Sequence, residues 1–202
     1  MEIAPIWQQN VVEVGAYALS LAELLGFVAG VLCVWLTARR NILNFPFGIA
    51  NCAFLLLLFV ETRLFADAIL QLVFIALSGF GWWQWAQGKR SDVVAIERAA
   101  PRELMLLGVA ALALTAGLCW WLGQVRGSLP FWDALITALS LCAQWLLNRR
   151  KLESWVVWIA VDLISIPVYL SRSLLLVALL YVIFLGLAIN GWFAWRRVAG
   201  AT

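Results

Sequence analysis

The stretch Gly81-Trp82-Trp83-Gln84-Trp85 returns 110 residues later as Gly191-Trp192-Phe193-Ala194-Trp195. The same offset, without a gap, places Arg39-Arg40 on Arg149-Arg150. Leucines match by chance in an apolar chain, but tryptophan, arginine and glycine matching in one register indicates an internal duplication. We therefore predict that two copies of one structural unit determine the fold.

The composition predicts an all-α integral membrane protein. Of the 202 residues, 65% are hydrophobic and only 12% are charged, whereas soluble domains carry about 25% charged residues. A transmembrane helix needs roughly 20 mostly apolar residues. The apolar runs between charged residues predict seven transmembrane helices, near residues 20–38, 46–60, 65–87, 103–124, 132–147, 155–170 and 173–195.

The duplication assigns these helices to units. Residues 20–90 form the first three-helix repeat, 103–124 a linker helix and 130–197 the second repeat, and we expect the N-terminal segment 1–19 to be a short interfacial helix. The first helices of the two repeats are four spans apart, so both repeats cross the membrane in the same direction. Parallel repeats are typical of transporters, with a site near mid-membrane between the repeats. Duplication retained for packing alone is the alternative.

Lys and Arg residues are distributed unequally between the two ends of the predicted helices. Of the 14, only Arg63, Arg126 and Arg172 fall on one side, and all the others fall on the opposite side. Cytoplasmic loops carry an excess of Lys and Arg, which predicts an N-terminus outside and a C-terminus in the cytoplasm. This asymmetry explains the net charge of +3, and we expect no nucleic-acid partner.

The residue types that are missing argue against an enzyme. The chain has no histidine, so imidazole catalysis and histidine metal ligation are excluded. No Walker A or dinucleotide-binding glycine motif is present. The four cysteines lie singly in apolar runs, without the paired spacing of a metal site. We expect no cofactor, no metal and no ATP-driven step.

One face of the predicted helix 155–170 combines aromatic and polar groups. Trp155, Trp158, Asp162, Ser165 and Tyr169 follow one another at intervals of three and four residues, the spacing that places side chains on one helical face. A carboxylate at this depth costs about 2.5 to 3.5 kcal/mol on insertion scales, which indicates a function. Indole rings beside a carboxylate suit a flat, aromatic, positively charged ligand.

A purely structural interpretation of these residues is also open. Asp162 would then pair with Arg149 or Arg150, and the indoles would form an interfacial aromatic belt. For Trp85 and Trp195, at the cytoplasmic ends of the two repeats, such a belt is the leading interpretation.

Uncharged polar side chains also occur deep within other predicted helices. They are Thr137, Ser140, Gln144 and Asn148 on the fifth helix, Gln71 and Ser78 with Trp82 on the third, and Asn190 on the seventh. Amides can bind a carboxamide or a hydroxyl, or they can join helices through hydrogen bonds worth about 0.6 kcal/mol each. Trp82 is also a candidate gate residue.

The run from Gln144 to Asp162, with its Trp-x-x-Trp-x-x-x-Asp spacing, is similar to the PnuC family of vitamin transporters. Pro46-Phe47-Gly48-Ile49 and the Gly-Trp-Trp-Gln-Trp ending share this resemblance, which covers residues 20–197. The resemblance implies a 3+1+3 helix arrangement like that of the SWEET transporters. It also implies a homo-oligomer, with a trimer as one candidate, in contact with membrane lipid.

The resemblance further implies uptake of nicotinamide riboside across the bacterial inner membrane by facilitated diffusion, with an intracellular kinase trapping the substrate. Relatives transport thiamine or riboflavin. We expect Trp155 and Trp158 to stack on the pyridinium ring, with Asp162 beside it. The remaining predicted substrate contacts are Gln71, Gln144, Asn190, Asn148, Trp82 and Tyr169. Thiamine transport and, from another class, a membrane channel are the alternatives.

Overall fold

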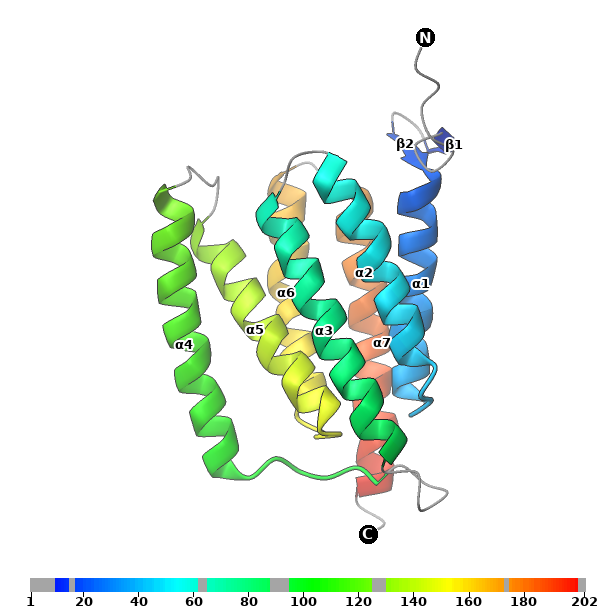
Figure 1. Cartoon of the computed structure of the whole chain (residues 1–202). Helices are drawn as coiled ribbons and strands as arrows, with labels where there is room; N and C mark the ends of the chain where they lie inside the picture. Colours follow the sequence, from blue (N-terminus) through cyan, green and yellow to red (C-terminus); the bar gives the residue numbers. More distant parts are fainter. Residues whose placement is uncertain are drawn as a thin grey trace.

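The computed structural model describes residues 10–14, 17–61, 65–87, 95–124, 130–172 and 175–199. Within these ranges the chain forms seven α-helices and one short β-hairpin (Figure 1). The helices are α1 (Leu21–Ala38), α2 (Asn44–Glu61), α3 (Phe65–Gln87), α4 (Pro101–Gln124), α5 (Pro130–Asn148), α6 (Ser154–Ser171) and α7 (Leu175–Ala199).

The seven predicted helices are confirmed, with ends that differ by a few residues. The largest difference is at α7, which continues to Ala199 because Arg196 and Arg197 lie in its last turn, where cations stabilise the C-terminal end of the helix dipole. At the other end of the chain, Ser20 and Glu23 form a capping box that starts α1. Pro46 is accommodated in the first turn of α2, where its missing N–H has no helical partner.

The expectation of an interfacial helix at residues 1–19 is wrong for the part that the structure describes. Residues Asn10–Val14 (β1) and Tyr17–Ser20 (β2) form an antiparallel hairpin, with Val14 opposite Tyr17. The stretch Val11-Val12-Glu13-Val14 is rich in β-branched residues, which favour strands over helices. Residues 1–9 lie outside the described ranges.

Four helices in the described part of the chain are long and apolar enough to cross a membrane. They cover Ala68–Gln87, Pro101–Trp121, Ser154–Ser171 and Val177–Ala199. The segments Glu23–Ala38 and Asn44–Leu58 are apolar but shorter. Helix α5 includes Asp133 and the amides Gln144 and Asn148, which lower its hydropathy.

The helices pack as two groups that contact each other at two places. In the first group α2 lies between α1 and α3, and in the second α6 lies between α5 and α7. Helix α1 also packs against α7, and α3 packs against α5, so six helices form a closed ring. Helix α4 packs against α5 at the edge of the molecule (Figure 1).

Equivalent positions in the two groups make equivalent contacts. The Phe45 and Trp85 rings meet edge to face, with centroids 5.2 Å apart and an interplanar angle of 86°. Their counterparts 110 residues later, Trp155 and Trp195, meet at 5.4 Å and 89°. The duplication read from the sequence is therefore repeated in the packing of the side chains.

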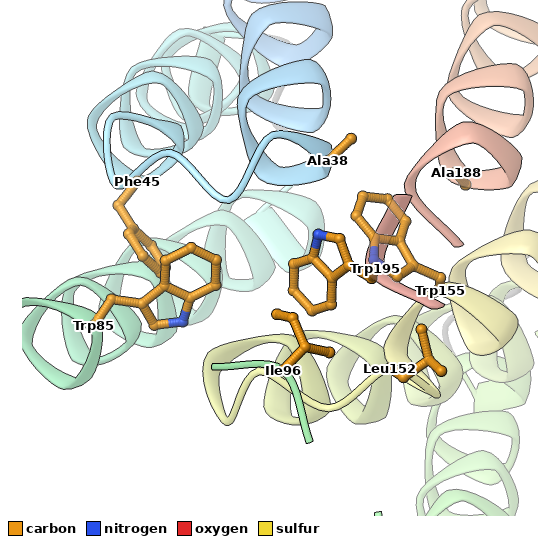
Figure 2. Packing of buried hydrophobic residues seen from close by; sticks show 8 residues of the cluster. All are labelled: Ala38, Phe45, Trp85, Ile96, Leu152, Trp155, Ala188 and Trp195. Carbon is orange, nitrogen blue, oxygen red and sulfur yellow. The ribbon is translucent and has the colours of Figure 1, made fainter. Parts of the chain in front are cut away.

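Trp85 and Trp195 join the two groups, which corrects the prediction that they form an interfacial belt. Both side chains are completely buried, in a cluster that also contains Ile96, Leu152 and Ala38 (Figure 2). The Trp85 indole N–H donates to the carbonyl of Asn148, and the Trp195 indole N–H donates to the carbonyl of Thr37, both at 3.1 Å. Each indole thus satisfies a carbonyl at the C-terminal end of the other group's first helix.

Two glycines make this packing possible. A Cβ atom on Gly191 would lie 2.5 Å from the Trp155 ring, and one on Gly81 would lie 2.6 Å from Phe45 and closer still to Asn148. Such contacts are too short for carbon atoms, so only glycine lets the aromatic rings reach the helix backbone.

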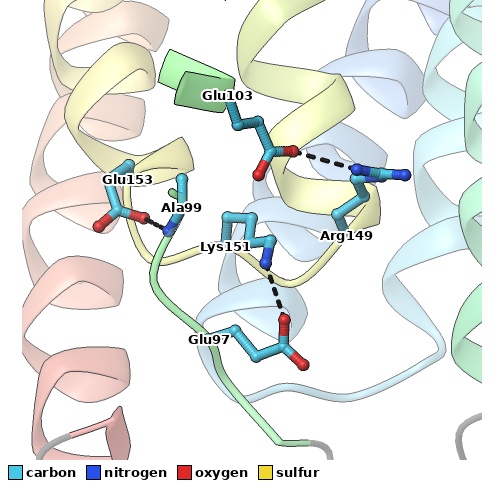
Figure 3. Close-up of polar contacts among 6 residues, drawn as sticks. All are labelled: Glu97, Ala99, Glu103, Arg149, Lys151 and Glu153. Carbon is cyan, nitrogen blue, oxygen red and sulfur yellow. Dashed lines mark hydrogen bonds and ion pairs between the residues drawn. The ribbon is translucent and has the colours of Figure 1, made fainter. Parts of the chain in front are cut away.

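The segment that precedes α4 is bound to the turn between α5 and α6 (Figure 3). Glu97 exchanges backbone hydrogen bonds with Arg150 and Leu152, at 3.2 and 2.9 Å. The Ala99 N–H donates to the Glu153 carboxylate at 2.7 Å, and Lys151 pairs with Glu97 at 2.7 Å. The hydrogen bond and the charge of Lys151 hold the pKa of the Glu97 carboxyl below its usual range.

Candidate functional site

The polar face predicted on helix 155–170 lies on α6 and points into the ring of helices. Trp155 is 1% exposed and Asp162 3% exposed, and Ser165 is fully buried. Trp158, one turn after Trp155, is partly buried and packs on the edge of the tryptophan cluster. Because these residues share one helical face, α6 presents an indole, a carboxylate and a hydroxyl in succession to the interior.

The charge of Asp162 is not neutralised within the described part of the chain. Its carboxylate forms neither a hydrogen bond nor an ion pair there. Arg149, which the structural interpretation paired with Asp162, instead contacts Glu103 at 3.2 Å. The interpretation of Asp162 as one half of an internal ion pair is therefore wrong. A buried, unpaired carboxylate is costly, and a cationic ligand would remove that cost.

Aromatic side chains of α6 and α7 line the same region. The rings of Tyr169 and Tyr181 lie 5.0 Å apart at 37°, and Tyr181 meets Phe184 at 5.9 Å. The Tyr181 hydroxyl is within electrostatic range of Asp162. It also lies near the Ser165 hydroxyl, but outside hydrogen-bonding geometry. Tyr169, Tyr181 and Phe184 thus form a row of aromatic rings on α6 and α7.

The first group of helices closes this region from the other side. A Cβ atom on Gly30 of α1 would lie 3.2 Å from the Phe184 ring and 2.7 Å from the amide nitrogen of Asn51 on α2. Glycine at position 30 therefore lets Phe184 and the Asn51 carboxamide approach the α1 backbone together. The region bounded by α1, α2, α6 and α7 contains the carboxylate, an amide and three aromatic rings.

Two further polar groups on the predicted face of α6 lack partners within the described residues, as does the Ser154 hydroxyl at the start of the helix. The Trp155 indole N–H and the Ser165 hydroxyl are both buried and form no hydrogen bond. Buried polar groups are bonded in the great majority of proteins, so each exception needs an explanation. Together with Asp162, the Trp155 indole and the Ser165 hydroxyl provide one hydrogen-bond donor, one acceptor and one group that can act as both. A polar ligand could bind to these groups.

The predicted amides on α5 are used within the protein. Gln144 donates to the Asn148 side-chain oxygen at 3.1 Å, and the Asn148 amide donates to the Leu77 carbonyl of α3 at 2.8 Å. Asn148 is 1% exposed. In this conformation the pair joins α5 to α3, which agrees with the interpretation of these amides as interhelical hydrogen bonds.

The other predicted contacts are spread over α3 and α7. Gln71 is buried on α3, whereas Trp82 is 41% exposed and Asn190 is also exposed. Within the part of the chain that the structure describes, none of the three makes a hydrogen bond or ring contact with the α6 face. For all nine residues, the role of a substrate contact remains a prediction.

Tyr181, Phe184 and Asn51 were not predicted as site residues from the sequence. Tyr181 is the counterpart of Gln71 at the 110-residue offset, and Phe184 is the counterpart of Phe74. Extending the list to the repeat mate of each candidate would have found Tyr181. Asn51 carried no such signal, because its counterpart is Val161 and its proximity to α7 depends on the packing of α1.

Comparisons with known proteins identify the family of the chain. The family model described as "Nicotinamide mononucleotide transporter" matches residues 20–197. The nicotinamide riboside transporter PnuC of Escherichia coli (strain K12) is 26% identical, over 92% of this chain and 89% of its own length. The riboflavin/roseoflavin transporter RibM of Streptomyces davaonensis is also 26% identical, over 86% and 84%.

A solved structure has the same fold. The crystal structure of the vitamin B3 transporter PnuC aligns with a TM-score of 0.74 at 22% identity, covering 89% of this chain and 82% of that one. The family and its relatives are transporters and not enzymes. The match over nearly the whole helical region, together with several apolar helices, leads to one conclusion: the chain is a multi-pass membrane protein and belongs to the nicotinamide mononucleotide transporter family.

Proposed function

We propose that this protein imports nicotinamide riboside across the bacterial inner membrane. The observation that carries the proposal is the unpaired Asp162 carboxylate among aromatic rings, inside a closed ring of helices. Nicotinamide riboside is a flat pyridinium cation with a carboxamide and ribose hydroxyls. Charge, ring and hydrogen-bonding groups each have a complement on or beside the α6 face.

The residues take the following roles in this proposal. Trp158 stacks on the pyridinium ring, and Trp155, covered by Trp195, closes the site towards the basic end of the molecule. Asp162 balances the charge of the ring. Tyr169, Gln71, Gln144, Asn148, Asn190 and Trp82 line the path or bind the carboxamide and the sugar as α3, α5 and α7 move. Tyr181 and Asn51 join this set.

The positive charge of nicotinamide riboside distinguishes it from riboflavin, which the RibM relative is named for. Riboflavin carries no positive charge, so its binding would leave the Asp162 carboxylate buried and uncompensated. A cationic substrate therefore suits this chain better than a neutral one. Thiamine is also cationic and aromatic, and the binding titrations described below distinguish it from nicotinamide riboside as the substrate.

The proposal includes a transport mechanism and an orientation. Six helices in two parallel three-helix repeats with α4 as linker, the 3+1+3 arrangement of SWEET transporters, would rock about the site. The 18 residues of α1 and of α2 extend about 27 Å, close to the hydrocarbon thickness of about 30 Å, which supports seven spans. The clusters of Lys and Arg favour a cytoplasmic C-terminus. We also propose a homo-oligomer, with a trimer as the candidate.

Binding titrations on the purified protein test the substrate. We expect saturable binding of nicotinamide riboside, and binding of thiamine and riboflavin at least about tenfold weaker, by roughly 1.4 kcal/mol. Saturable binding of thiamine without binding of nicotinamide riboside would overturn the assignment.

Flux into proteoliposomes tests the mechanism. A facilitated carrier saturates with substrate and equalises the two concentrations without an ion gradient. Flux that rises linearly with concentration would indicate a channel, and accumulation driven by a sodium or proton gradient would indicate coupled transport.

A further inference from the structure

Two open surface cavities adjoin at the basic end of the helix ring, away from the α6 face. The first, of about 550 Å³, lies between α3 and α5 and is lined by Gln84, Glu97 and Arg149-Arg150-Lys151 among others. The second, of about 580 Å³, lies between α4 and α5, with Leu106, Ala110 and Trp145 in its wall. Arg149 lines both cavities. The first cavity is mostly polar and the second mostly apolar, so the pair is shaped for an amphiphile.

The charge around the two cavities is positive. Among the described residues, Arg102, Arg149, Arg150 and Lys151 line the two cavities together with only two carboxylates, Glu97 and Glu103. Both carboxylates are engaged, Glu97 by Lys151 and Glu103 by Arg149. Arg150 belongs to no ion pair among the described residues. Within the described part of the chain, the first cavity therefore lacks an anion to pair with Arg150.

Aromatic rings beside the first cavity indicate its depth in the membrane. Phe80 stacks with Trp83 at 5.9 Å and with Trp145 at 6.4 Å, and the Trp83 side chain is 57% exposed. The Arg149 guanidinium lies 5.0 Å from the centre of the Trp145 ring. Exposed tryptophans in membrane proteins gather at the level of the lipid headgroups. The first cavity is therefore level with lipid phosphates.

The second cavity leads towards the hydrocarbon region. Helix α4 is apolar beyond its first turn, and among the described helices it packs mainly against α5. Leu106, in the cavity wall, is 62% exposed. An acyl chain lying there would cover an apolar surface of α4 next to Arg149.

Gln84 adds a requirement for the headgroup. Its side-chain carbonyl oxygen is buried and has no hydrogen-bond donor within the described residues. A phosphate diester has acceptors only, whereas the glycerol headgroup of phosphatidylglycerol also carries two hydroxyl donors. A hydroxylated, anionic headgroup therefore satisfies both Arg150 and Gln84.

We propose that these two cavities form one binding site for phosphatidylglycerol, with the phosphate at Arg149 and Arg150, a headgroup hydroxyl at Gln84, and an acyl chain along α4. Basic pockets between transmembrane helices commonly bind anionic lipid headgroups. The site does not depend on the identity of the transported substrate, since none of its proposed contacts lies on the α6 face.

The repeat provides a matched control for the experiment. Arg40 and Arg150 occupy equivalent turns, and both have φ of 58°, but Arg40 lines neither cavity. Asparagine tolerates this backbone conformation, so Arg150→Asn and Arg40→Asn remove the same charge at the same cost to the turn.

Native mass spectrometry of the purified protein, mixed with phosphatidylglycerol or phosphatidylcholine, measures the bound lipid. We expect a preference for phosphatidylglycerol, a reduction of about fivefold in its retention for Arg150→Asn, as for the loss of one cation near a lipid phosphate, and no reduction for Arg40→Asn. Equal retention of the two lipids, or an equal loss for both variants, would overturn the proposal.

A second variant tests the acyl-chain cavity. Ala110 is exposed on α4, so Ala110→Trp fills the cavity without disturbing the helix ring. We expect it to lower the retention of phosphatidylglycerol at least threefold and to leave binding of free glycerol 3-phosphate unchanged. If glycerol 3-phosphate binds with the same dependence on Arg150 while Ala110→Trp leaves lipid retention intact, the ligand is a soluble phosphate and the lipid assignment is wrong.

Discussion

Helices α2 and α6 occupy equivalent places in the two groups but differ in chemistry. Phe45 in α2 and Trp155 in α6 have the same role, since each meets a buried tryptophan of its own group edge to face. One and two turns later the helices diverge, because Gly48 and Cys52 of α2 correspond to Trp158 and Asp162 of α6. The repeated contacts hold the molecule together, and the unrepeated ones carry the proposed site.

The surroundings of these positions differ as well. A Cβ atom on Gly48 would lie 3.1 Å from the Cys33 sulfur, so α1 and α2 are closely packed where α6 carries an indole. A second set of aromatic and charged groups in α2 would have no room. Duplication thus supplied a symmetric frame, and only the second copy carries the Trp158 and Asp162 side chains of the proposed site.

Substitution at the repeated contacts has the largest expected effect. Gly81→Ala and Gly191→Ala place a methyl group against Phe45 and Trp155, respectively, and overpacking of this kind costs about 3 kcal/mol. We expect both variants to lower the melting temperature of the detergent-solubilised protein by a similar amount. Gly79→Ala and Gly186→Ala on the same helices are the controls, since nothing lies within 4 Å of a Cβ atom at either position. A variant at Gly81 or Gly191 as stable as its control would disprove the shared role.

The second-largest effect is expected for substitution of Asp162, whose carboxylate has no counterpart in the first repeat. Asp162→Asn keeps the shape of the side chain and removes the charge, and the loss of one charged contact costs about 2 kcal/mol, or about 30-fold in affinity for nicotinamide riboside. Cys52→Ser, at the equivalent position of α2, is expected to leave the affinity within twofold. Isothermal titration calorimetry measures both. An unchanged affinity for Asp162→Asn would remove Asp162 from the substrate site.

Substitution of the two buried tryptophans is expected to have a smaller effect on stability, of similar size in the two repeats. Trp85→Phe and Trp195→Phe retain an aromatic ring but remove the hydrogen bonds to Asn148 and Thr37, at a cost of about 1 to 2 kcal/mol each. Thermal unfolding is the measurement, and Trp83→Phe is the control because Trp83 is largely exposed. Very different losses for Trp85→Phe and Trp195→Phe would mean that the two junctions are not equivalent.

The smallest effect is expected at the ion pair of the segment that precedes α4. Glu97→Gln removes the ion pair with Lys151, and an exposed pair contributes well under 1 kcal/mol. Because folding lowers the pKa of Glu97, the pair stabilises the protein above the unfolded pKa of about 4.3. This stability is lost as the pH falls through the lower folded pKa.

Melting curves of Glu97→Gln and the unaltered protein test this dependence on pH. We expect the unaltered protein to be slightly more stable at pH 7 and the difference to vanish when Glu97 becomes protonated. A difference that grows as the pH falls would contradict the role of Lys151 as the partner of Glu97.

Much of the architecture could be predicted from the sequence, because local patterns determine it. Uninterrupted apolar runs must form helices to satisfy their backbone groups, and all seven predicted helices are present within the described ranges. The match between Gly81-Trp82-Trp83-Gln84-Trp85 and its copy predicted the duplication, which the paired contacts of Trp85 and Trp195 repeat in space. The Trp158–Asp162 face followed from helical spacing alone.

The helices, the repeat and the chemical character of the α6 face thus follow from local sequence. The burial of Trp85 and Trp195 between the two groups and the pairing of Arg149 with Glu103 follow only from the packing of the helices. The same packing places the Tyr181 hydroxyl within electrostatic range of Asp162. These two sets of features differ in the range of the interactions that produce them. Helical periodicity acts over a few residues along the chain, whereas burial and charge pairing depend on which side chains the packing of distant helices brings together.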